Sequence, residues 1–243
     1  MWRKVPTLAL AILIPAASAC GPRVDDAPVR PRAVPAANRT PARPAPAPVP
    51  VAGPPLVVFL GDSLTAGLGL DEDQAYPALI ERQLKEGGEA VRVLNAGVSG
   101  DTTAGGLSRI GWLLGQHPDV VVLGLGANDG LRALPLAEID KNLREIVRRS
   151  KAAGARVLLL GMRIPPNYGP YADQFAELYP RIAKDLDVPL VPFLLEGVGG
   201  DRSLNQADGI HPTAEGQEIL AKNVRPALEK VLAEPAEKPA AAP

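Results

Sequence analysis

Two short segments of the sequence carry side chains that could together perform nucleophilic catalysis. Ser63 lies in Gly61-Asp62-Ser63-Leu64, directly after the apolar run Leu56–Leu60. Far along the chain, Asp208 and His211 stand three positions apart in one short segment. A histidine can remove the proton of a serine hydroxyl while an aspartate orients and stabilises the imidazole. An Asp-Ser pair alone would more simply cap a helix, so the interpretation depends on what the fold brings together.

Two further loops have the composition of an anion-binding turn. Gly97 and Gly100 lie in Asn95–Thr102, where glycine lets the backbone present N–H groups and approach a bound oxyanion. Asn128 lies in Gly126–Gly130 and could donate a hydrogen bond from its carboxamide. Ordinary turn and capping chemistry explains each loop about equally well. Neither loop therefore decides between the two roles.

The elements expected to position these loops alternate regularly along the chain. Apolar runs rich in β-branched residues predict strands buried on both faces, and amphipathic stretches between them predict helices. The expected strands are Leu56–Leu60, Val91–Leu94, Val120–Leu125, Arg156–Leu160 and Pro189–Phe193, and the expected helices are Tyr76–Lys85, Ala104–Leu114, Ala137–Ala152, Asp173–Asp185 and Thr213–Leu232. This alternation predicts one α/β domain with a parallel sheet in three α/β/α layers. Each polar loop above then follows a strand at the ligand-binding edge.

The scarcity of histidine narrows the choice of a general base. The chain has two histidines, His117 and His211. His117 precedes the third expected strand and should lie at the opposite edge of a parallel sheet from Ser63. His211 follows the last strand and precedes the final helix, at the edge where Ser63 is expected. His211 is therefore the predicted base.

The four segments in this order resemble the four sequence blocks of the SGNH (GDSL) hydrolases. The blocks are GDSL at 61–64, the loop containing Gly100, GANDG at 126–130 and DGIH at 208–211. The chain is most similar to the thioesterase, lysophospholipase and arylesterase branch, over roughly residues 56–232. One departure is Gly126-Ala127, where that branch often has two glycines. The resemblance implies a five-stranded sheet with flavodoxin-like strand order.

The resemblance also implies roles for individual residues. Ser63 would be the nucleophile, and Asp208 and His211 would complete the triad. The Ser63 amide, the Gly100 amide and the Asn128 side chain would form the oxyanion hole. The implied reaction is hydrolysis of acyl esters or thioesters through an acyl-enzyme, with no cofactor and no metal.

The segment after Asn128 is a candidate acyl-binding lip. It contains Leu131, Leu134 and Pro135, and it could equally be no more than the approach to the next helix. The equivalent loop contributes to substrate binding in the related enzymes, so we expect medium-length acyl groups. Tyr168 and Tyr171, after the fourth strand, are candidate rim residues whose alternative role is packing.

The N-terminal region has the composition of an export signal followed by a tether. Residues 1–19 combine a basic start with a short apolar core and predict a signal peptide. Cys20, the only cysteine, follows Ala17-Ser18-Ala19, which suits either lipoprotein processing or ordinary secretory cleavage. We expect a lipid-anchored protein of the bacterial cell envelope, with a soluble periplasmic or secreted protein as the alternative. Residues 20–55 hold many of the 27 prolines and predict a disordered tether, and 233–243 predict a disordered tail.

The charge and the motifs of the sequence argue against several other classes of protein function. The formal net charge is −1, and because the leader and tether are basic, the remaining chain is acidic, which disfavours nucleic-acid binding. The sequence has no Gly-x-Ser-x-Gly elbow, no dinucleotide or Walker motif and no HExxH. We expect a monomer.

Two functions remain as alternatives to an acyl ester or thioester hydrolase. They are a polysaccharide O-acetyl esterase and a non-catalytic binding module on the same fold.

Overall fold

The domain is built on one parallel β-sheet of five strands, as expected. The computed structural model describes residues 53–234, so the predicted leader, Cys20, most of the tether and nearly all of the tail lie outside the described residues. The strands are β1 (Leu56–Gly61), β2 (Arg92–Gly97), β3 (Val120–Gly124), β4 (Arg156–Leu160) and β5 (Leu190–Val191). Their spatial order, β2-β1-β3-β4-β5, is the flavodoxin-like order that the family resemblance implies.

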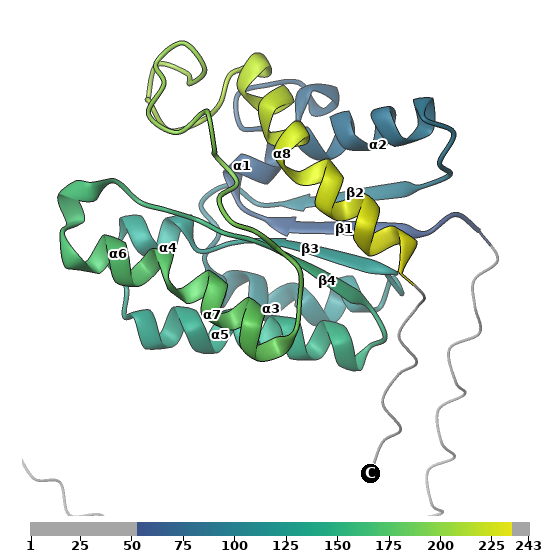
Figure 1. Cartoon of the computed structure of the whole chain (residues 1–243), viewed down its shortest axis with the longest axis horizontal. Coiled ribbons are helices and arrows are strands. Elements are labelled where there is room, and N and C mark those ends of the chain that lie inside the picture. The colour runs from purple at the N-terminus through teal and green to yellow at the C-terminus, as the bar shows by residue number, and fades with distance from the viewer. Residues whose placement is uncertain (1–52, 235–243) are drawn as a thin grey trace, which may run out of the picture. The chain divides into compact units, whose positions relative to one another are not determined.

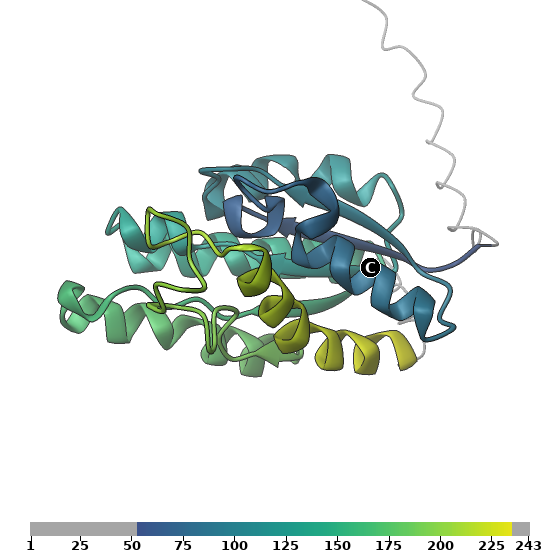
Figure 2. The ribbon, with the colours of Figure 1, turned by 90° about the horizontal axis from the view of Figure 1, so that it is seen from above.

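Helices cover both faces of this sheet and give the three predicted layers. Helices α2 and α8 lie over one face, and α3, α5 and α7 lie over the other (Figures 1 and 2). The helices are α1 (Ser63–Ala66), α2 (Tyr76–Glu86), α3 (Thr103–Leu114), α4 (Ala127–Leu131), α5 (Leu136–Ala152), α6 (Pro170–Ala176), α7 (Leu178–Leu186) and α8 (Ala214–Ala233), with 3₁₀ turns at Glu72–Gln74 and Pro166–Tyr168. Within residues 53–234, none of these helices is both long and apolar enough to cross a membrane.

The central strands form the floor of the core. Every residue of β3 and β4 is buried, and β1 is buried after its first residue. Strands covered on both faces need apolar side chains in both directions, which explains their continuous apolar runs. The β1 and β3 strands pair in register from Val57↔Val120 to Gly61↔Gly124, so their carboxyl ends stop at the same level.

The structure differs from the sequence prediction in two places, and proline is the cause at both. The single helix expected over Asp173–Asp185 is two helices, α6 and α7, separated at Glu177. Pro180 has no N–H to bond the carbonyl of Ala176, so the first helix ends there. The fifth strand spans two residues instead of five, because Pro189 and Pro192 flank it and cannot donate to the ladder.

Gln217 of α8 connects three helices through buried hydrogen bonds. Its Oε1 accepts from the Tyr76 amide at 2.9 Å, and its Nε2 donates to the Leu64 carbonyl at 3.2 Å. Tyr76 begins α2 after Ala75, which offers no side-chain cap, so Gln217 supplies the missing acceptor. The same side chain fixes α1, which begins with Ser63.

Replacing Gln217 by leucine should therefore destabilise the domain while keeping its volume. The change leaves two buried backbone groups unpaired, each costing about 1–3 kcal/mol, so we expect the free energy of unfolding to fall by roughly 2–6 kcal/mol. Urea denaturation followed by circular dichroism measures it. Glu218→Ala is the matched control because Glu218 is exposed on the same helix. Equal stabilities of the two variants would show that these hydrogen bonds contribute nothing.

Candidate active site

Ser63 lies at the carboxyl end of β1, where a sharp turn leads into a short helix. Asp62 is the N-cap of α1 and accepts a hydrogen bond from the Leu64 amide at 3.0 Å. Gly61 is required by close packing, because a Cβ there would collide with the side chain of Thr65. Ser63 is 9% exposed, so its hydroxyl lies at the edge of solvent on a rigid turn.

His211 and Asp208 lie beside Ser63 in a hydrogen-bonded chain. His211 Nε2 lies 2.8 Å from Ser63 Oγ, and His211 Nδ1 lies 2.6 Å from Asp208 Oδ2. The other oxygen of Asp208 accepts from the amides of Ile210 and His211 at 2.9 and 3.0 Å. The hydrogen bond from His211, followed by those from the two amides, holds the pKa of Asp208 well below its usual range. Asp208 is therefore a carboxylate that orients the ring.

The loop that carries His211 is held from both sides. The Gln206 amide donates to the His211 carbonyl at 2.7 Å, and Asn205 forms an antiparallel bridge with Pro212. The Gln206 side chain donates to the carbonyl of Leu68, which follows α1, at 2.7 Å. The loops of Ser63 and His211 are thus joined by a second contact besides the serine–histidine bond.

Asn128 lies at the same sheet edge, in the first turn of α4. Its Nδ2 lies 3.3 Å from Asp62 Oδ2, which directs the carboxamide toward the Ser63 turn. Gly126 has φ +116°, and a Cβ there would collide with the Tyr179 hydroxyl. Ala127 is already helical. The departure from a double glycine therefore falls at a position that tolerates a side chain.

Gly100 lies in the exposed turn after β2, with φ +79°. The Asp101 amide closes this turn by donating to the Val98 carbonyl at 3.0 Å. Arg132 donates to the Gly100 carbonyl at 3.2 Å. Among residues 53–234, the Gly100 amide has no hydrogen-bond acceptor, which leaves it able to bind an anion.

Asp129 is a buried residue of this edge that the sequence prediction missed. Its two oxygens accept from the amide and the hydroxyl of Thr103 at 2.9 and 2.6 Å. The contact fixes α4, and with it Asn128, against the first turn of α3. Nothing in the local sequence distinguishes Asp129 from a turn aspartate, since its partner is 26 positions away.

The predicted acyl-binding segment is held by two tyrosine hydroxyls. Tyr168 donates to the Leu131 carbonyl at 2.8 Å, and Tyr171 donates to the Leu134 carbonyl at 2.6 Å. Both leucines and both tyrosines are partly buried against the core, and Pro135 is exposed where α5 begins. Packing is therefore one role of these tyrosines, and their contact with substrate stays a prediction.

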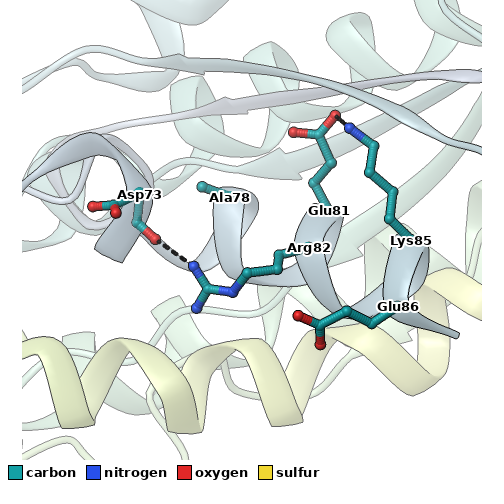
Figure 3. A pocket seen from close by; sticks show the side chains of 6 residues that line it. All are labelled: Asp73, Ala78, Glu81, Arg82, Lys85 and Glu86. Atoms are coloured by element: carbon teal, nitrogen blue, oxygen red, sulfur yellow. Dashed lines mark hydrogen bonds and ion pairs between the residues drawn. The ribbon is translucent and has the colours of Figure 1, made fainter.

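Other features of the described residues lie apart from this constellation. His117 is exposed in the turn before β3, at the opposite edge of the sheet. A shallow hollow on the outer side of α2 is lined by Asp73, Ala78, Glu81, Arg82, Lys85 and Glu86 (Figure 3). Within it, Lys85 pairs with Glu81, and Arg82 donates to the backbone carbonyl of Asp73. None of its residues belongs to the loops of Ser63, Gly100, Asn128 or His211. No cluster of metal-ligating side chains occurs between Gly53 and Glu234.

Asp62 carries a buried carboxyl next to Ser63. It is 1% exposed, and burial raises its pKa to about 6, although the hydrogen bond from the Leu64 amide and the nearby His211 oppose the shift. The two aspartates of the site thus have pKa values displaced in opposite directions.

Comparison with known proteins gives consistent matches over the described domain. Residues 59–219 match the GDSL-like lipase/acylhydrolase family. The chain is 47% identical to the esterase TesA of Pseudomonas aeruginosa over 178 residues, which is 72% of this chain and 89% of that protein. It is 42% identical to thioesterase 1/protease 1/lysophospholipase L1 of Escherichia coli K12 over 167 residues, 68% of this chain and 79% of that one. A crystal structure of TesA superposes with a TM-score of 0.71 at 46% identity, covering 72% of this chain and 99% of that one.

The raised pKa of Asp62 predicts a specific pH dependence of stability. Between about pH 4 and pH 6 the unfolded chain has lost this proton while the folded protein keeps it. The folded state binds more protons there, so its stability should fall as the pH rises through this window. Asp62→Asn removes that contribution. Urea denaturation at several pH values should show wild type losing stability relative to Asp62→Asn from pH 4 to 6, and a constant difference would contradict the assignment.

Proposed function

The chain belongs to the GDSL-like lipase/acylhydrolase family, and from this membership and the geometry of the site we propose that it is a serine hydrolase of acyl esters and thioesters. The observation that carries the proposal is the chain of contacts from Ser63 through His211 to Asp208, at 2.8 and 2.6 Å. A nucleophile, a base and an orienting carboxylate in that order are the parts that acyl transfer requires.

The reaction proceeds in two steps of acyl transfer. Ser63 Oγ attacks the acyl carbonyl while His211 Nε2 takes the hydroxyl proton, which gives a tetrahedral intermediate. The intermediate collapses to an acyl-serine as His211 returns the proton to the leaving alcohol or thiol. A water molecule, deprotonated by His211, then attacks the acyl-serine; the carboxylic acid is released as His211 returns the proton to Ser63 Oγ. All proton transfers use protein side chains and water.

The negative oxygen of the intermediate is stabilised by three donors. These are the Ser63 amide, the Gly100 amide and Asn128 Nδ2. The position of Ser63 at the first turn of α1 supports this role, because first-turn amides lack helical acceptors. The contact of Asn128 with Asp62 supports it too, since Nδ2 has two hydrogens and one stays available for substrate.

Apolar side chains at the sheet edge support acyl groups of medium length as the substrate. Leu68, Val98 and Ile210 are exposed in the three loops that surround Ser63. We assign Leu131, Leu134, Pro135 and Tyr168 to the far side of the acyl site. Burial of an acyl chain against such groups contributes roughly 0.8 kcal/mol per CH₂.

The composition of the N-terminal region supports an exported, membrane-anchored enzyme. In this proposal, residues 1–19 are the signal peptide, Cys20 carries the lipid and 20–55 form the tether. The hydrolase domain follows at 56–232, and 233–243 is a tail. A tether of this length would let the domain reach esters in the surrounding membrane or solution.

Substitution of the triad tests the proposed chemistry. Ser63→Ala and His211→Ala should each lower kcat on a p-nitrophenyl ester of medium chain length by at least about 1,000-fold, because each removes a group that reacts. His117→Ala should keep kcat within about threefold of wild type, because His117 lies at the other edge of the sheet. Near-wild-type turnover by Ser63→Ala, or inactivation by His117→Ala, would overturn the assignment.

Lipid attachment at Cys20 has a separate test. Wild type expressed in a bacterial host should incorporate labelled palmitate and fractionate with membranes, because acyl chains give roughly 0.8 kcal/mol per buried CH₂. Cys20→Ser should do neither. A wild-type protein that is cleaved and exported without label would establish ordinary secretion.

A further inference from the structure

Arg109 of α3 donates hydrogen bonds to three chain segments at the edge of the proposed active site. Its Nε donates to Asp101 Oδ2 at 2.8 Å, its Nη1 to the Ala96 carbonyl at 2.7 Å and its Nη2 to the Gly61 carbonyl at 2.9 Å. The side chain is 22% exposed, and that of Asp101 is 11% exposed. A partly buried guanidinium with all three nitrogens bonded holds its partners in a fixed geometry.

The three acceptors flank the groups that we assign to the oxyanion hole. Gly61 is two residues before Ser63, and Asp101 directly follows Gly100. Ala96 precedes the turn that carries Gly100. The guanidinium therefore joins the end of β1, which delivers Ser63, to both sides of the turn after β2. It sets the separation between the two backbone amides that the mechanism uses.

The first turn of α3 is shaped to admit the carboxylate of Asp101. A Cβ at Gly105 would collide with Asp101 Oδ1. Glycine inside a helix normally lowers the stability of the helix. At position 105 it leaves the space that the Asp101 carboxylate occupies. Asp101 Oδ1 also accepts from the Thr102 amide at 3.0 Å. The aspartate is thus placed independently of Arg109 and fixes the guanidinium in turn.

The turn that Arg109 holds has few other attachments. Gly100 is exposed, and its contacts are the turn bond from Asp101 to Val98 and the bond from the exposed Arg132. A third bond reaches the turn from the Val98 amide, which donates to the Gly61 carbonyl at 3.1 Å, the same oxygen that Arg109 binds. Without the guanidinium, the position of the Gly100 amide would depend on the turn bond, on the Val98–Gly61 backbone bond and on the exposed Arg132.

We propose that Arg109 is a positioning residue of the oxyanion hole, which holds the Gly100 amide at the correct distance from Ser63. The inference rests on the proposed function. Arg109 is assigned no contact with a reacting atom, because each of its three nitrogens donates to an acceptor within the protein. Its effect should appear in the transition state, where the oxyanion forms, and not in substrate binding.

The test compares Arg109→Met with Arg144→Met. Arg144 is a matched control because it makes similar bonds, to Asp140 at 2.7 Å and Asp185 at 2.8 Å, between α5 and α7. With p-nitrophenyl butyrate, Arg109→Met should lower kcat by about 10- to 100-fold, since small displacements of catalytic groups have effects of this size. KM should stay within threefold. Arg144→Met should lose stability without losing kcat.

A reversible inhibitor separates positioning from general loosening of the fold. Butylboronic acid forms a tetrahedral adduct with a reactive serine and places an oxygen in the oxyanion hole. Its Ki should rise for Arg109→Met by about the same factor as kcat/KM falls, and should be unchanged for Arg144→Met. Folded Arg109→Met with kcat and Ki within threefold of wild type would overturn the inference.

Two milder variants decide the question if Arg109→Met does not fold. Arg109→Lys keeps the positive charge but loses the planar guanidinium that reaches several acceptors at once. Asp101→Asn keeps the shape of the side chain but loses the ion pair with Arg109. We expect each to lose at least fivefold in kcat while retaining the wild-type circular dichroism spectrum, and wild-type kcat in both would overturn the inference. A folded wild-type protein without esterase activity would instead refute the proposed function, and with it the role of Arg109.

Discussion

The hydrogen bond between His211 and Ser63 joins residues 148 positions apart, and the arrangement of the domain explains how it forms. Ser63 is placed by β1, which lies inside the sheet between β2 and β3. His211 is placed by the loop that leads into α8, and α8 covers the face over β4 and β5. Gln217 then ties α8 to the short helix that begins with Ser63. A misplaced α8 would separate Ser63 from His211 even with the sheet intact.

Parallel strands bring the polar loops to one edge but do not fix them there. The loops are short and partly exposed, so they lack the repeated backbone bonds that hold the core. Buried or half-buried side chains take over this function: Arg109 for the Gly100 turn, Asp129 for α4 and Gln206 for the His211 loop. Each of these bonds joins different loops, so the edge behaves as one network in which neighbouring substitutions should not be additive.

The central sheet and the three side chains that meet at its edge could be picked out from the sequence more fully than the contacts that hold them. The apolar runs of β1, β3 and β4 identify them as strands, because burial on both faces demands such runs. Ser63 and His211 could be named because few residue types perform their chemistry. Arg109, Asp129 and Gln217 could not, since arginine, aspartate and glutamine are common at surfaces and their partners lie at distant positions. The break at Glu177 is hard to predict because the helical periodicity of the sequence continues through Pro180.

The electrostatics of the two aspartates favour Asp208 over Asp62 as the partner of the proposed base, His211. Asp62 precedes Ser63 in the sequence, and it lies near enough to His211 for an electrostatic interaction. Burial nevertheless favours the neutral form of Asp62. Asp208 is exposed, and its three hydrogen bonds all favour the carboxylate. An imidazolium that forms during catalysis needs a partner that is ionised at every working pH. Asp208 meets this requirement because the hydrogen bonds from His211 and Ile210 stabilise its carboxylate, whereas the buried Asp62 contacts Asn128.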